Sequence, residues 1–268
     1  MKKVSFTVFM IAAMSFCAPA QHNQTKRTGE QKPLNILLFT ADDLDRNSLG
    51  CFGSTVPDIS PNIDRFATQS IRFEKAFVNA AICVPSRAMI ATGLYGNNSG
   101  VNGFNKMKEG TTIPLIMEIL RSHNYATGIL GKLSHSTPKA DFKWDYQFDQ
   151  QDLGFGRSPS LYYNGTKAFL DDCRKKDKPF YFMINSNDPH RPFFNPNESS
   201  EILAQRMNQP KERIEMLLKD QEAPSRIYSP DEINVPGFLP DLPKVREELS
   251  YYFNSVKRLD DAFGKVMQ

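Results

Sequence analysis

Short apolar runs separated by amphipathic segments of helical length organise most of this chain. Residues 35–40, 125–130 and 180–184 are continuous hydrophobic runs, which indicate strands buried on both faces of a sheet. Residues 71–77 predict a further short strand. Hydrophobic positions three and four apart predict helices over residues 61–67, 86–93, 113–123, 163–174 and 243–267. Strands that alternate with helices predict an α/β fold with a central, mostly parallel sheet flanked by helices.

The first twenty residues have the pattern of a secretory signal peptide. Lys2 and Lys3 precede an apolar run over residues 4–16, which is too short to span a membrane, and small residues follow at 18–20. We therefore expect residues 1–20 to be removed. The mature protein is then secreted or periplasmic and has no membrane span.

Cys17 leaves a lipoprotein anchor open as an alternative, but the bulky Phe16 before it is unlike the small residue that a lipidation signal prefers. The next segment, residues 21–33, is polar and predicts a flexible lead-in. A single domain is then expected over residues 34–268.

Composition narrows the function classes. The 268 residues are 40% hydrophobic and 24% charged, which is enough for one sizeable core. Loss of residues 1–20 removes two lysines and no acid, so the formal net charge falls from +3 to +1. That charge gives no global field for nucleic acid, which we exclude as a partner. Whether Cys51 and Cys173 pair in an oxidising compartment stays open.

Polar residues follow three of the predicted strands. Asp42 and Asp43 end the first run, Lys132 and His135 follow the second, and His190 follows the last. Ligands of open α/β sheets bind at the carboxyl ends of the strands, so this convergence indicates an enzyme. Taken singly, each feature has a plainer alternative: a solvated turn for the aspartates, and surface positions for the lysine and histidines. The buried strand before the aspartates favours a hard divalent cation instead.

The sequence Cys-Val-Pro-Ser-Arg at residues 83–87 is the most specific motif in the chain. Cys83 and Arg87 are four apart and share one face of a helix. Cys83 stands at the start of that helix, where free N–H groups favour an anion, and Arg87 adds charged donors. The alternative is a buried cysteine and a surface arginine.

With this motif the chain resembles the type I sulfatases, a family of the alkaline-phosphatase-like superfamily. The matching segments occur in family order at residues 35–43, 60–65, 83–87, 131–132 and 188–193. Two segments, residues 188–191 and 235–241, are most similar to the heparan N-sulfatase branch, the N-sulfoglucosamine sulfohydrolases. The resemblance implies an alkaline-phosphatase-like sandwich and a hydrolase of sulfate esters or sulfamates.

The resemblance also implies a modified cysteine and a metal. Cys83 would be converted to formylglycine by a formylglycine-generating or anaerobic sulfatase-maturating enzyme. Asp42, Asp43 and the modified Cys83 would bind one Ca²⁺. One hydroxyl of the hydrated aldehyde would attack sulfur, and Arg87 would steady that hydrate.

Three further residues take roles from the same resemblance. Lys132 would hold the sulfate oxygens as charge develops. His190 would protonate the leaving oxygen or nitrogen. His135, one position further from the lysine than is common in the family, would take a proton from the second hydroxyl so that sulfate is expelled.

The family's second pair of calcium ligands, Asp-Asn, would follow the helix at 243–267, whereas the sequence given stops at Gln268. We therefore expect a partial catalytic domain that is incomplete at its C-terminus and poorly active alone. The predicted function is removal of sulfate from sulfated glycans, with N-sulfoglucosamine of heparan-type chains as substrate. The alternatives are an O-sulfatase, a phosphate- or phosphonate-ester hydrolase, and an inactive fragment that keeps only the fold or glycan binding.

Overall fold

The computed structural model describes residues 32–268, and residues 34–268 form one compact unit. The signal peptide predicted for residues 1–20, and all but the last two residues of the predicted lead-in at 21–33, lie outside the described residues. Among the described helices, none is long and apolar enough to cross a membrane.

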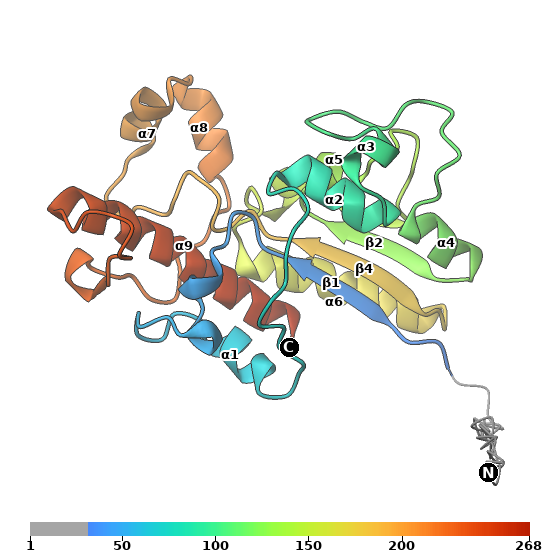
Figure 1. Ribbon diagram of the computed structural model, residues 1–268, viewed down its shortest axis with the longest axis horizontal. Helices are drawn as coiled ribbons and strands as arrows, with labels where there is room; N and C mark the ends of the chain where they lie inside the picture. The colour runs from blue at the N-terminus through green and yellow to red at the C-terminus, as the bar shows by residue number, and fades with distance from the viewer. Residues whose placement is uncertain (1–31) are drawn as a thin grey trace, which may run out of the picture. The chain divides into compact units, whose positions relative to one another are not determined.

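A parallel sheet forms the centre of this unit (Figure 1). Its strands are β1 (Ile36–Thr40), β2 (Ala126–Leu130), β3 (Tyr146–Phe148) and β4 (Phe180–Asn185). The strands run in the order β1-β4-β2-β3, and every pair is parallel. Met183 of the central β4 lies opposite both Leu38 of β1 and Ile129 of β2. The predicted α/β fold with a parallel sheet is therefore confirmed.

Helices cover both faces of the sheet (Figure 1). They are α2 (Cys83–Thr92) and α4 (Ile116–Ser122) on one face, and α6 (Pro159–Lys175) and α9 (Pro243–Val266) on the other. Because side chains alternate along a strand, Tyr181 and Met183 of β4 lie in the first core, and Phe182 and Ile184 in the second. Burial on both faces explains why β4 is a continuous apolar run.

Helix α1 (Pro61–Ala67) packs against α9 and has no side-chain cap of its own. Asp260 of α9 takes that role, since its carboxylate accepts hydrogen bonds from the backbone N–H groups of Asn62 and Ile63 at 3.3 and 2.8 Å. The remaining helices are α3 (Gly96–Ser99), α5 (Leu133–Ser136), α7 (Ser200–Met207) and α8 (Lys211–Leu218), with 3₁₀ turns at Arg46–Ser48, Gly50–Phe52, Gln150–Leu153 and Pro230–Glu232.

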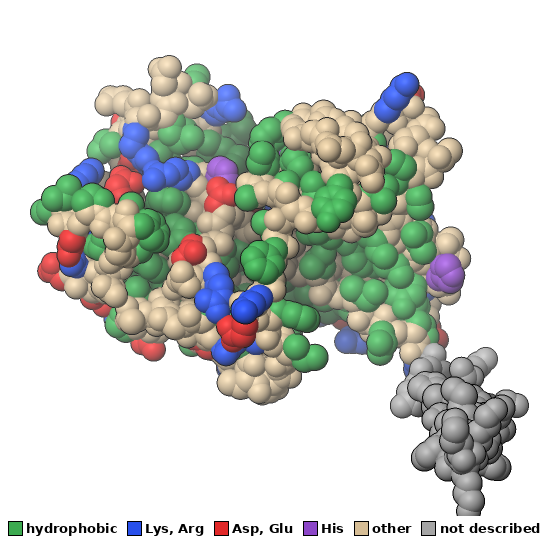
Figure 2. Space-filling view, in the orientation of Figure 1, with side chains coloured by type: hydrophobic (Ala, Val, Ile, Leu, Met, Phe, Trp, Pro, Cys, Tyr) green, Lys and Arg blue, Asp and Glu red, His purple; other side chains and the backbone are tan. Residues whose placement is uncertain are grey.

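The strand predicted for residues 71–77 is wrong. The segment has no regular structure, and its apolar side chains Ile71, Phe73 and Phe77 are exposed. The outer edge of β1 pairs with no other described strand. An apolar run becomes a strand only when a neighbouring strand pairs with its backbone, and no described strand pairs with this segment. Figure 2 shows hydrophobic side chains over the middle of the molecular surface that faces the viewer.

Candidate functional site

The carboxyl ends of three strands bring most of the predicted site residues to one edge of the sheet. Asp42 follows β1, Lys132 follows β2, and His190 follows β4 in a turn that begins after Asn185. Helix α2 begins at Cys83 and carries Arg87 toward the same edge.

Asp42 is the buried centre of this group. Its side chain is 5% exposed, and its carboxylate lies 2.5 Å from Lys132 Nζ and 3.7 Å from Arg87 Nη2. Lys132 and Arg87 are buried as well. Two cations therefore share one carboxylate, and the cluster has one positive charge in excess. An excess positive charge at a sheet edge suits the binding of an anionic group.

Arg87 also contacts two residues that the sequence analysis did not select. Its Nη1 donates to Thr40 Oγ1 at 2.9 Å and to Asn185 Oδ1. The Asn185 amide nitrogen donates to the carbonyl oxygens of Leu130 and Gly131 at 3.3 and 3.0 Å. Asn185 thus links the ends of β1, β2 and β4. A polar residue that ends a fully apolar run was the signal that could have identified it.

Burial lowers the pKa of Arg87, and the nearby Asp42 carboxylate opposes that shift. A guanidinium normally titrates so far above neutrality that it keeps its charge. Arg87 is therefore a fixed cation with a defined direction, not the surface arginine of the plainer alternative.

Cys83 is half-buried at the first position of α2. The residue before it, Ile82, makes no side-chain cap, so the N–H groups of Cys83 and Val84 stay available to an anion. A cavity of about 390 Å³ opens here and is lined by Cys83, Asp42, Asp43 and Arg87 among others. A small tetrahedral group fits beside Cys83. Cys51 and Cys173 form no disulfide with another cysteine in residues 32–268, and they lie in separate cores.

His135 lies on α5, the one-turn helix that begins directly after Lys132, and its ring is half-buried. Burial lowers its pKa, and the positive charge of Lys132 lowers it further. Its Nδ1 is buried without a hydrogen-bond partner. A neutral imidazole with a free ring nitrogen has the properties of a general base.

His190 lies in the turn after β4 and is 45% exposed. Its Nδ1 lies 2.6 Å from the carbonyl oxygen of Arg191, so Nδ1 is the nitrogen that donates. The other nitrogen, Nε2, faces outward, 3.7 Å from the Asp43 carboxylate. Nε2 is therefore the atom that can exchange a proton with a ligand.

A buried ion cluster fixes the turn that carries His190. Arg258 of α9 donates to both oxygens of Asp188, at 2.7 and 3.0 Å. Arg157 donates to Asp188 at 3.2 Å and to the carbonyl oxygen of His190 at 2.8 Å. All three charged side chains are buried. The sequence analysis assigned a role to neither arginine.

The predicted calcium ligands do not form one group. Asp42 is buried and already neutralised by Lys132 and Arg87, whereas the adjacent Asp43 is 67% exposed and turned toward His190. No set of three or more His, Cys, Asp or Glu residues in the part of the chain that the structure describes is arranged to hold a metal ion. Since calcium takes about six to eight oxygen ligands, the described residues do not by themselves fit it.

Comparison with known proteins agrees with the geometry. The sulfatase family model matches residues 34–268. The chain is 28% identical over 254 residues to N-sulphoglucosamine sulphohydrolase of Homo sapiens, covering 88% of this chain and 47% of that protein. It is 27% identical over 319 residues to iduronate 2-sulfatase of Mus musculus, covering 97% and 55%. The chain thus spans about half the length of these curated relatives.

The fold is also similar to that of solved enzymes. The phosphonate monoester hydrolase of Agrobacterium radiobacter matches with a TM-score of 0.58 at 15% identity, covering 88% of this chain and 59% of that chain. At this identity the match shows likeness of fold alone. The family model, by contrast, covers almost every described residue and includes the Cys83–Arg87 motif, the ends of β1 and β2, and the His190 turn. The chain therefore belongs to the sulfatase family.

Proposed function

We propose that this chain carries the nucleophile-bearing part of a sulfatase active site that removes sulfate from sulfated glycans, with N-sulfoglucosamine as the preferred unit. One observation carries the proposal. Cys83 begins α2 beside a buried cluster of Arg87, Lys132 and Asp42 that has one positive charge in excess. This is the environment that a sulfate group and an oxidised cysteine both require.

The formylglycine proposed at position 83 would supply the nucleophilic oxygen and a route for sulfate release. The chain's own residues do the rest. Arg87 is held by Thr40 and Asn185 through Nη1 and faces Asp42 through Nη2, so its charge keeps a fixed place in the cavity that Cys83 also lines. Lys132 can transfer part of its interaction from Asp42 to a sulfate oxygen as negative charge develops there.

Two histidines with different environments serve proton transfer. His135 has a lowered pKa and an unpartnered Nδ1, which suit removal of a proton. His190 presents Nε2 outward from a fixed turn, which suits delivery of a proton to the leaving nitrogen or oxygen. Because the leaving atom belongs to the sugar, the sugar must extend toward the His190 side of the site.

The intact mass of the peptide spanning Cys83 tests the central claim. Conversion of the CH₂–SH side chain to an aldehyde lowers the mass by about 18 Da. We expect that loss when the chain is produced together with a sulfatase-maturating enzyme, and no loss in Cys83→Ala. An unmodified cysteine under these conditions would contradict the proposed nucleophile.

Substrate choice is tested with three matched compounds: N-sulfoglucosamine, glucosamine 6-O-sulfate and glucosamine 6-phosphate. The similarity to N-sulphoglucosamine sulphohydrolase supports sulfamate as the first substrate. The match to iduronate 2-sulfatase, which covers 97% of this chain, supports an O-sulfatase as the second candidate. A higher kcat/KM for the phosphate than for either sulfated sugar would overturn both.

Calcium and secretion are further parts of this proposal. A calcium ion at Asp42 requires the Asp43 side chain to turn inward and more oxygen donors than these two residues offer. Secretion or a periplasmic location rests on the sequence of residues 1–20. N-terminal sequencing of the mature protein tests the second point, with Gln21 as the expected first residue.

A further inference from the structure

A fully buried asparagine ends the central strand of the sheet. Asn185 is the last residue of β4, whose other residues are apolar or aromatic, and its exposed fraction is 0%. A side-chain amide buried in this way destabilises a fold unless its two acceptor sites and its two N–H donors find hydrogen-bond partners. The role of Asn185 therefore follows from the partners of these four positions.

The acceptor half of the amide holds Arg87. Asn185 Oδ1 accepts a hydrogen bond from Arg87 Nη1 and a second one from Thr40 Oγ1 at 2.7 Å. The same Arg87 Nη1 donates to Thr40 Oγ1 at 2.9 Å, so the three side chains form a closed group. One nitrogen of the guanidinium is thereby fixed, and the other, Nη2, lies 3.7 Å from the Asp42 carboxylate.

The donor half of the amide holds the turn that carries Lys132. Asn185 Nδ2 donates to the carbonyl oxygens of Leu130 and Gly131 at 3.3 and 3.0 Å, and Lys132 is the next residue. Lys132 has a φ of 51°, in the left-handed region, which a residue other than glycine keeps only where its surroundings hold it. A Cβ added at Gly131 would collide with the Asn185 carbonyl oxygen, so the end of β4 and this turn are in direct contact.

We propose that Asn185 is a positioning residue, which sets the relative placement of Arg87 and Lys132 and through them the affinity of the site for a tetrahedral anion. The amide is neutral, so the cluster that these two cations form with Asp42 keeps one positive charge in excess. An aspartate of the same shape at position 185 would cancel that charge. The proposal rests on the proposed function in one respect, which is that the anion is sulfate.

Anion affinity separates this role from a purely structural one. Sodium sulfate is titrated into the full chain at constant ionic strength, with chloride as the balancing anion, and the Arg87 Nε–H resonance is followed by NMR. Asn185→Ala removes both halves of the amide, so we expect the dissociation constant for sulfate to rise about three- to tenfold. Asn185→Asp keeps the acceptor, loses the donors and adds a negative charge beside Arg87, so the constant should rise at least about tenfold.

Asn254 provides the matched control for the loss of a buried amide. Its exposed fraction is also 0%, and its amide accepts from the Tyr228 N–H at 2.8 Å and donates to the Phe194 carbonyl oxygen at 3.3 Å. Neither partner belongs to the cluster that binds the anion. Asn254→Ala should therefore lower the urea midpoint of unfolding but leave the dissociation constant for sulfate as in the parent chain. Equal loss of sulfate affinity in Asn254→Ala and Asn185→Ala overturns the proposal.

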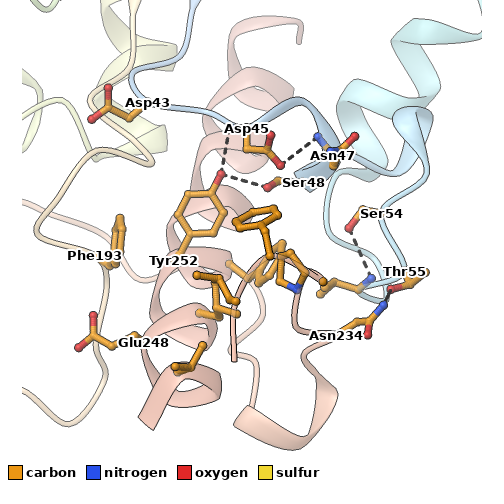
Figure 3. A pocket seen from close by; sticks show the side chains of 18 of the residues that line it. Asp43, Asp45, Asn47, Ser48, Ser54, Thr55, Phe193, Asn234, Glu248 and Tyr252 are labelled. Carbon is orange, nitrogen blue, oxygen red and sulfur yellow. Dashed lines mark hydrogen bonds between the residues drawn. The ribbon is translucent and has the colours of Figure 1, made fainter. Parts of the chain in front are cut away.

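The larger neighbouring cavity, which shares Asp43 with the cavity at Cys83, provides a control for location. It has a volume of about 800 Å³ and presents three carboxylates against two cations, so its lining does not favour an anion. The carboxylates are those of Asp43, Asp45 and Glu248 (Figure 3), and the cations are Arg191 and Lys244. Arg191→Ala should bind sulfate as the parent chain does. A loss of affinity equal to that of Asn185→Ala would place the anion in this cavity and overturn the proposal.

Asn185→Ser keeps the proposal testable where the other two Asn185 variants do not fold. Its hydroxyl can accept from Arg87 but has one proton, so it cannot donate to both carbonyl oxygens, and we expect about threefold weaker sulfate binding. Unchanged affinity in every folded Asn185 variant, or no saturable sulfate binding by the parent chain, overturns the positioning role. If the variants lose sulfate affinity while the parent chain hydrolyses no sulfated sugar, the positioning role stands and the proposed function fails.

Discussion

Adjacent residues of one type have opposite environments at this site. Asp42 and Asp43 are neighbours in the sequence, yet one is buried between two cations and the other is mostly exposed. Sequence reasoning treated them as one pair of metal ligands, because pattern alone does not show which way a side chain turns. Asp43 has a φ of 60°, in the left-handed region, and this local geometry separates the two carboxylates.

This contrast gives a matched pair of variants. Asp42→Ala leaves Lys132 and Arg87 buried without their carboxylate, so we expect the free energy of unfolding to fall by about 3–5 kcal/mol. Asp43→Ala should change it by no more than about 0.5 kcal/mol, because this side chain lies mostly in solvent. Urea unfolding of both variants measures the difference, and equal losses would contradict the assignment of Asp42 as the buried partner.

His135 allows a second prediction at the residue scale. Because burial and Lys132 lower its pKa, the folded state favours the neutral ring. Its contribution to stability is then present above the ordinary histidine value of about 6.5 and is lost as the pH falls below it. An NMR titration of the imidazole should give a pKa below about 6.5. The free energy of unfolding of His135→Gln should depend less on pH below about 6.5 than that of the parent chain. A measured His135 pKa at or above the ordinary histidine value would refute the proposed base.

Among the secondary-structure elements, the continuous apolar runs were the most predictable. Three of the four strands and the long helices α6 and α9 were expected from hydrophobic pattern, since burial on a sheet face imposes that pattern directly. The three-residue β3 and the one-turn helix α5 were not predicted, because elements this short show no hydrophobic periodicity. The strand predicted at residues 71–77 was wrong for a different reason. A hydrophobic pattern shows which side chains a segment could bury, but not whether a neighbouring strand pairs with it.

Gly128 of β2 packs so closely against rings of α6 and β4 that a methyl group at this position does not fit. A Cβ added at Gly128 would lie 2.8 Å from ring atoms of both Phe169 and Phe182. Gly128→Ala should therefore lower the free energy of unfolding by about 1–3 kcal/mol through overpacking. Gly103→Ala, whose added atom meets nothing closer than 3.9 Å, is the control and should change little. A shift of the thermal midpoint in the control but not in Gly128→Ala would show that the packing is looser than described.

At the scale of the whole molecule, the site is assembled from segments far apart in the sequence. Cys83, Lys132 and His190 could each be selected from motifs, and the structure places them along one edge of the sheet. Arg157 and Arg258 could not be selected, because their importance lies in a shared partner, Asp188, that only the fold reveals. Sequence motifs therefore select the residues that gather at this edge more readily than the buried residues that hold them in place.

Metal binding is the prediction that belongs to this scale. Since residues 32–268 contain no ready group of ligands, we expect calcium to bind this chain with a dissociation constant of about 1 mM or weaker. Turnover should be correspondingly slow. Calorimetric titration with CaCl₂ measures the affinity, with Asp42→Asn as the matched variant. Micromolar binding that disappears in Asp42→Asn would mean that Asp43 turns inward to join it.

The open outer edge of β1 has a practical consequence. This edge pairs with no other described strand, and the apolar side chains of Ile71, Phe73, Phe77 and Val78 elsewhere in the unit are exposed. Edges of this kind template pairing between molecules. The purified chain should therefore self-associate as its concentration rises, and sedimentation velocity over a dilution series would reveal it. Solutions for binding studies are therefore best kept dilute, so that the measured affinity is that of single molecules.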